Sequence, residues 1–202
     1  MSTPTIPMSE PTAQPEPLSE PKAVQRRSLS ELLPTGGTRV LVAATGFALA
    51  VASFAKFGLH GRALLGAVFC PTLVLLATID LKHKVLPNAI IFPATIAVGV
   101  IVAASTPGDF LTHLAAGAAL GGFFFAFAAF FPGSMGMGDA KLGFLLGLAL
   151  GSKTLGATLI AFAGLLVAAL FILATRGASA RKDAIPFGPF LALGGILAFF
   201  LG

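Results

Sequence analysis

Seven apolar segments follow one another along this 202-residue sequence, and they constrain its fold more than any other feature. A bilayer core of about 30 Å is crossed by about 20 helical residues, and most of the segments approach that length. The pattern predicts an all-α fold, a polytopic transmembrane helix bundle with about seven spans. The fifth and last segments are the short ones. The segments lie at 39–57, 62–80, 88–105, 111–131, 138–151, 154–175 and 187–202.

Composition agrees with insertion into a membrane. Hydrophobic residues make up 56% of the chain and charged residues only 10%, whereas a soluble domain carries about a quarter charged residues. The net charge of +5 raises the question of nucleic acid. However, the basic residues are scattered over short loops and form no single basic face, so no nucleic-acid partner is predicted.

The distribution of Lys and Arg over the loops predicts the orientation, because cytoplasmic loops of membrane proteins carry the excess. With the N-terminus inside, ten of these residues fall on the inner side and three on the outer side. The inner ones are Lys22, Arg26, Arg27, Arg39, Lys82, Lys84, Lys141, Arg176, Arg181 and Lys182, and the outer ones are Lys56, Arg62 and Lys153. The prediction is a cytoplasmic N-terminus.

Three regions are expected along the chain. Residues 1–36 are rich in Pro, Ser, Thr and Glu, so we interpret them as a disordered cytoplasmic tail. Residues 37–57 form an N-terminal transmembrane helix, and 62–202 form a six-span core. The one cysteine, Cys70, lies in an apolar run and excludes both an internal disulfide and a Cys-x-x-Cys zinc pair.

Two acids, Asp80 and Asp139, mark the candidate site. Asp80 closes the second apolar segment, and Asp139 opens the fifth behind Gly136 and Gly138. An ionisable residue in or beside a membrane segment is costly, which makes it a functional-site hypothesis by default. The predicted topology places both acids at the cytoplasmic boundary.

Glycines predict how the fifth segment packs. Gly143, Gly147 and Gly151 follow Asp139 at intervals of four residues, so they share its helical face. Such a repeat of small residues marks close packing of membrane helices. We therefore expect Asp139 to point into a protein interface, and Gly117 and Gly121 give the fourth segment a similar face.

Two carboxylates held close together in a poorly hydrated place cannot both ionise cheaply, so they are expected to share one proton. The ionised acid can then activate water while the protonated one polarises a carbonyl, without metal or cofactor. Lys82, Lys84 and Lys141 are near enough in sequence to offset the remaining charge. Simpler alternatives are helix capping by Asp139 and an interfacial ion pair between Asp80 and Lys84.

Three separated motifs resemble those of the prepilin peptidase family, the membrane aspartyl proteases with a Gly-x-Gly-Asp motif. The resemblance covers roughly residues 62–202 and implies catalytic roles for Asp80 and Asp139. It also implies that the last motif is a structural or substrate-contact segment near the site. The motifs are Asp80 through Leu86-Pro87-Asn88, then Gly136-x-Gly138-Asp139-x-Lys141-Leu142, and Ile185-Pro186-Phe187-Gly188-Pro189-Phe190.

The resemblance further implies the biological setting. Such enzymes cut the leader from type IV pilin-like precursors at the cytoplasmic face of the bacterial inner membrane, so prepilins or pseudopilins and the bilayer are the expected partners. Larger members add an N-terminal region with paired Cys-x-x-Cys motifs and methyltransferase activity. Because this sequence has one cysteine, we expect cleavage without N-methylation and no S-adenosylmethionine site.

Three other functions fit parts of the pattern. A presenilin-like or signal-peptide-peptidase-like intramembrane protease shares the Gly-x-Gly-Asp logic, but the matching Pro-Ala-Leu triplet is absent. A small proton- or cation-coupled transporter would place its ionisable groups at the midplane and often shows a repeat. A non-catalytic assembly protein is the third alternative.

Overall fold

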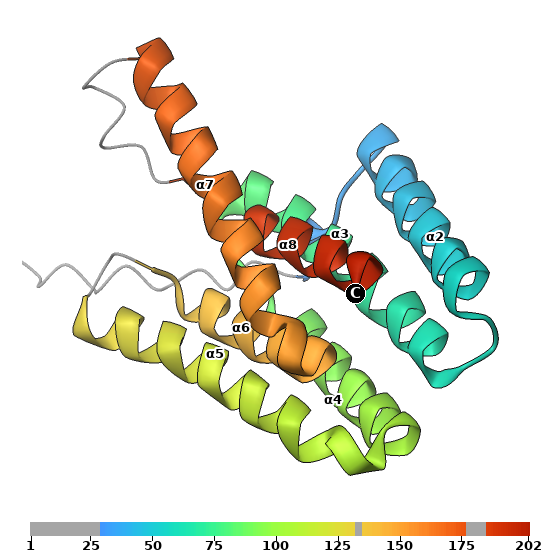
Figure 1. The fold of residues 1–202 in the computed structure, drawn as a ribbon. Helices are drawn as coiled ribbons and strands as arrows, with labels where there is room; N and C mark the ends of the chain where they lie inside the picture. The colour runs from blue at the N-terminus through green and yellow to red at the C-terminus, as the bar shows by residue number, and fades with distance from the viewer. Residues whose placement is uncertain (1–28, 132–134, 177–184) are drawn as a thin grey trace, which may run out of the picture.

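The structure, a computed structural model, describes residues 29–131, 135–176 and 185–202, and these residues form helices and no strand (Figure 1). Each of the seven predicted apolar segments is a helix, which confirms the all-α prediction. The helices are α1 (Leu29–Leu32), α2 (Gly37–Phe57), α3 (Gly61–His83), α4 (Asn88–Ser105), α5 (Phe110–Phe130), α6 (Met137–Leu150), α7 (Thr154–Arg176) and α8 (Gly188–Leu201), with 3-10 turns η1 (Pro107–Asp109) and η2 (Gly151–Lys153).

Five helical stretches among the described residues are long and apolar enough to cross a membrane. They are Gly37–Phe57, Gly61–His83, Asn88–Ser105, Pro107–Phe130 and Met137–Thr175. The helices α6 and α8 have 14 residues each, which makes them about 21 Å long. The stretch Met137–Thr175 contains α6, η2 and α7 in succession, and Gly151, with φ 57, ends α6 before α7 begins. The chain is a polytopic helical membrane protein.

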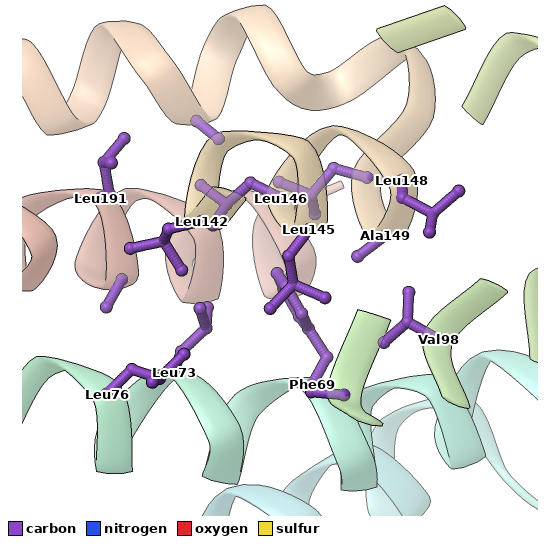
Figure 2. Packing of buried hydrophobic residues seen from close by; sticks show 14 of the residues in the cluster. Phe69, Leu73, Leu76, Val98, Leu142, Leu145, Leu146, Leu148, Ala149 and Leu191 are labelled. Atoms are coloured by element: carbon purple, nitrogen blue, oxygen red, sulfur yellow. The ribbon is translucent and has the colours of Figure 1, made fainter. Parts of the chain in front are cut away.

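The helix α6 lies at the centre of the bundle. Its residues Leu142, Leu145 and Leu146 are fully buried. Figure 2 shows leucines of α6 pointing toward Phe69 and Leu73 of α3, with α8 packed beside them. Because neighbouring helices pack around α6, its first turn, which carries Asp139, is fixed in position.

The glycine face of α6 packs closely on a neighbouring helix, as expected, and that neighbour is the glycine face of α5. A Cβ on Gly147 would collide with the carbonyl group of Ala116 and lie 2.5 Å from Cα of Gly117. A Cβ on Gly121 would lie 2.8 Å from Cβ of Phe144. The two backbones approach so closely that side chains at these positions would separate the helices.

The helix α2 lies at the edge of the bundle beside α3 (Figure 1). Gly46 packs against Pro71 of α3, whose Cβ would be 3.2 Å from a Cβ at residue 46. Within the predicted tail, Leu29–Leu32 forms one helical turn, and Leu32 is buried. Residues 1–28, with most of that tail, lie outside the described residues, as do Arg181 and Lys182.

Candidate active site

The end of α3 and the starts of α4, α6 and α8 meet at one end of the bundle, and both predicted acids lie there. Asp80 is 6% exposed and Asp139 is 9% exposed. The two carboxylates are close enough for the charge of Asp80 to act on Asp139. Residues from distant parts of the sequence therefore form a single buried acidic pair.

Asp80 belongs to the last turn of α3 and is held from two directions. Its Oδ2 accepts a hydrogen bond of 3.0 Å from the backbone N–H of Gly188, at the start of α8. Its carbonyl accepts a 2.8 Å bond from the N–H of Lys84, which ends α3 in a left-handed conformation with φ 52. Lys84 also acts on Asp80 electrostatically, although it lies just beyond the end of the helix.

Asp139 is the third residue of α6, and it closes the first turn of its own helix. Its Oδ2 accepts a 3.3 Å hydrogen bond from the N–H of Gly136, and its N–H donates to the carbonyl of Gly136 over 3.0 Å. The helix-capping alternative is therefore part of the structure, with Gly136 and not Asp139 at the N-cap. Capping and participation in the acidic pair are compatible, because a carboxylate has several acceptor positions.

The loop between α3 and α4 packs against the start of α6. Gly138 faces Leu86 so closely that a Cβ on the glycine would lie 2.8 Å from Cβ of the leucine. Pro87 is buried as the N-cap of α4, one residue earlier than the helical first turn expected from the sequence. Lys141 donates to Oδ1 of Asn88 over 2.7 Å, which joins α6 to α4.

The remaining predicted residues surround the pair less directly. Pro186 and Pro189 are half-buried on either side of Gly188, at the start of α8. Lys82 and Lys84 are exposed at the end of α3, so they border the site at its surface. No group of three or more His, Cys, Asp or Glu that could hold a metal ion occurs among the described residues.

Phe92 was absent from the predicted site, and Leu86 and Phe187 were named in the motifs without roles of their own. The Lys141 ammonium lies 5.3 Å from the ring centroid of Phe92. Phe92 is four residues after Asn88 and so shares its helical face, which was the available signal. The buried Phe187 packs on rings of α5 and α7, and its motif did not indicate these contacts.

Fold and site together define a class: a polytopic helical membrane protein with a buried pair of carboxylates where helix ends converge. The comparisons with known proteins identify the family. The model of the type IV leader peptidase family matches residues 67–174, which is more than half of the chain. The chain belongs to this family.

Two curated relatives agree with that assignment. The prepilin leader peptidase/N-methyltransferase of Bacillus subtilis (strain 168) is 34% identical over 152 residues, which cover 73% of this chain and 59% of the relative. The protein of the same name from Burkholderia pseudomallei (strain 1026b) is 32% identical over 178 residues, which cover 84% of this chain and 56% of the relative. The chain thus spans less than three fifths of these relatives. No solved structure matches it.

Proposed function

We propose that this chain is an aspartyl endopeptidase that removes the leader peptide from type IV pilin-like precursors. The observation that supports this most is the acidic pair itself. Asp80 and Asp139 are both buried, and their charges interact, at the same end of a membrane bundle. Burying two acids together costs stability, and acids in such surroundings cluster at functional sites.

The chemistry follows from the shared proton. The ionised carboxylate accepts a proton from water as the water oxygen attacks the carbonyl carbon of the scissile peptide bond. The protonated carboxyl group donates to the carbonyl oxygen, which gives a tetrahedral intermediate with two hydroxyl groups. The C–N bond then breaks as the first acid passes its proton to the leaving nitrogen and the second acid takes a proton back from one of these hydroxyl groups. Each acid regains its starting state, and no covalent enzyme intermediate forms.

The names of the relatives suggest the substrate, and the distribution of charge suggests the membrane face. The relatives are named prepilin leader peptidases, and the Lys and Arg distribution favours a cytoplasmic location for the acidic pair. We expect the precursor to present a basic leader on the cytoplasmic side, while its apolar helix stays in the bilayer. We place the enzyme in the bacterial inner membrane with its N-terminus in the cytoplasm.

The relatives also carry N-methyltransferase in their names. This sequence contains one cysteine, so it cannot form paired Cys-x-x-Cys motifs by itself. We propose that the chain cleaves precursors without methylating the new N-terminus. Intact-mass measurement of the mature product tests this, because a methyl group adds about 14 Da, and a methylated product made by this chain alone would contradict it.

The test of the proposed function is co-expression with candidate precursors, followed by mass spectrometry of the product. Asp80→Asn and Asp139→Asn should each insert normally and leave the precursor uncut. Asp109→Asn is the matched control, because Asp109 is an exposed acid in η1 at the opposite end of the bundle. Normal processing by either of the first two variants would refute the mechanism. A cut deep within the apolar helix of the precursor would favour the presenilin-like alternative.

A further inference from the structure

The start of α8 makes a contact with the acidic pair that the chemistry above does not use. The backbone N–H of Gly188 donates to Oδ2 of Asp80 over 3.0 Å, and the contact is buried. It joins the first turn of α8 to the last turn of α3. A helix N-terminus also carries partial positive charge, which complements the charge of a nearby carboxylate.

Gly188 is the residue in this turn whose N–H is available for that role. Pro189, the next residue, has no N–H. The N–H groups of Phe190 and Leu191 both donate to the carbonyl of Phe187, over 3.1 and 3.2 Å. The sequence of the turn thus leaves one donor for the carboxylate.

The absence of a side chain at Gly188 is equally important. An ideal Cβ at this position would lie 2.6 Å from Oδ2, 3.0 Å from Cγ and 3.2 Å from Cβ of Asp80. The first distance is too short for non-bonded atoms and the other two are tight, so even a methyl group would move the carboxylate from its observed position. The space beside Gly188 is filled by Asp80.

Phe187, the residue before Gly188, holds the first turn of α8 in position within the bundle. Phe187 is 8% exposed, and its ring centroid lies 5.6 Å from that of Phe124 in α5 and 5.3 Å from that of Phe162 in α7. Its contact with Phe124 is edge to face, an arrangement that favours one orientation. Two helices that do not carry the acids thereby hold the turn that contacts Asp80.

We infer that Phe187 and Gly188 form a positioning element for Asp80. Gly188 holds Oδ2 and sets the orientation of the carboxylate, which directs the other oxygen to the reaction, while Phe187 fixes Gly188. The inference rests on the proposed function, because it assigns a catalytic consequence to the position of Asp80.

The test compares two glycine-to-alanine variants of the full chain, with a precursor that the unaltered protein cleaves. Gly188→Ala should lower kcat about a hundredfold, since a shift of about 1 Å at a reacting group has that effect, and leave KM within about twofold. Gly156→Ala is the matched control, because nothing lies within 4 Å of a Cβ at that position in α7. A kcat within about threefold of normal for Gly188→Ala would overturn the inference.

If Gly188→Ala does not accumulate in the membrane, Phe187→Leu decides. It should lower kcat roughly tenfold with KM unchanged, because its ring contacts position the turn. Phe130→Leu is its control, since Phe130 is 80% exposed in α5. Equal kcat for the two leucine variants would overturn the inference. If Asp80→Asn is inactive while the variants of residues 187 and 188 are normal, the proposed function survives and only this inference fails.

Discussion

The helix α8 has a carboxylate at its start and two cations at its end. Comparing the two ends distinguishes an arrangement that stabilises the fold from one that, in our proposal, serves the reaction. At its start, the N–H of Gly188 faces the carboxylate of Asp80. At its end, Lys56 donates to the carbonyl of Phe200 and Arg62 donates to the carbonyl of Phe199. Both arrangements complement the helix dipole, which favours anions at the start and cations at the end.

The difference lies in hydration. Lys56 is exposed, and Arg62 also lies 4.4 Å from the ring centroid of Phe57. Arg62 lines a cavity of about 270 Å³ whose polar lining residues also include His113 and Lys153. The acids at the other end are buried, and each accepts a hydrogen bond from a backbone N–H. The same dipole therefore serves stability at the hydrated end and, in our proposal, holds a reactive acid at the dry end.

The largest expected effect is at the acidic end. Asp80→Asn or Asp139→Asn should lower the rate of precursor cleavage by on the order of 10²–10⁴-fold, because general acid–base catalysis contributes that much. The double variant should be no slower than the slower single variant, because residues that act as one unit lose their contribution together. Rate measurements on the three variants test this. Multiplicative losses would show that the two acids act independently.

The next largest effect is expected at one of the two glycines before Asp139, because alanine should be harmful at Gly138 and tolerated at Gly136. Gly138→Ala should cost about 1–3 kcal/mol of stability by overpacking against Leu86, and cleavage should fall roughly tenfold as Asp139 shifts. Gly136→Ala should be near normal, because the closest atom to its Cβ would be 3.6 Å away and its φ of −78 suits any residue. Cleavage rates and thermal unfolding of both variants give the comparison.

A compensating change tests the cause. Replacing Leu86 by Gly in the Gly138→Ala background removes the Cβ that the alanine would meet at 2.8 Å. Cleavage should recover in part, relative to Gly138→Ala alone. If Gly136→Ala is as harmful as Gly138→Ala and Leu86→Gly restores nothing, the glycines serve approach of the substrate backbone instead of helix packing.

The elements of this fold were predictable because their signals are local. Hydropathy indicated all seven helices. Two apolar segments, 88–105 and 111–131, lie between Asp80 and Asp139, so the chain was expected to return to the same end of the bundle. The glycine spacing of α6 predicted a closely packed face, since four-residue intervals define one side of a helix, but it did not identify α5 as the neighbour. The lengths of the apolar segments also signalled that α6 and α8 are short. The catalytic roles of the acids stay predictions.

What the sequence could not supply were the contacts between distant segments. The bond from Gly188 to Asp80 depends on how α8 is placed against α3, and no local pattern encodes that placement. The contacts of Gly138 with Leu86 and of Phe187 with Phe124 have the same origin. They arise from the packing of whole helices, so the motifs marked these glycines and this phenylalanine without indicating which residues they contact.

A smaller effect is expected at the hydrated end. Lys56→Gln and Arg62→Gln should each lower the free energy of unfolding by about 0.3–1 kcal/mol through loss of a cation at the end of α8. Arg62→Gln should lose about 0.5–1 kcal/mol more, because its contact with Phe57 also disappears. Unfolding in mixed detergent measures both, and cleavage should stay within about twofold. A large loss of cleavage in either variant would show that the end of α8 also affects the reaction, contrary to the distinction drawn between its two ends.

The smallest effect concerns the bridge from Lys141 to Asn88, which lies beside the acids but is exposed to solvent. The bond is short at 2.7 Å, yet exposed interactions of charged side chains contribute about 0.2–1 kcal/mol because water competes for both partners. A double-mutant cycle with Asn88→Ala and Lys141→Ala should give a coupling energy for unfolding within that range. The cycle isolates the pair, since contact of Lys141 with Phe92 is lost equally in both arms that lack the lysine. A coupling of several kcal/mol would mean that the bridge is shielded from water like the acids, and the dry region would then extend to the start of α4.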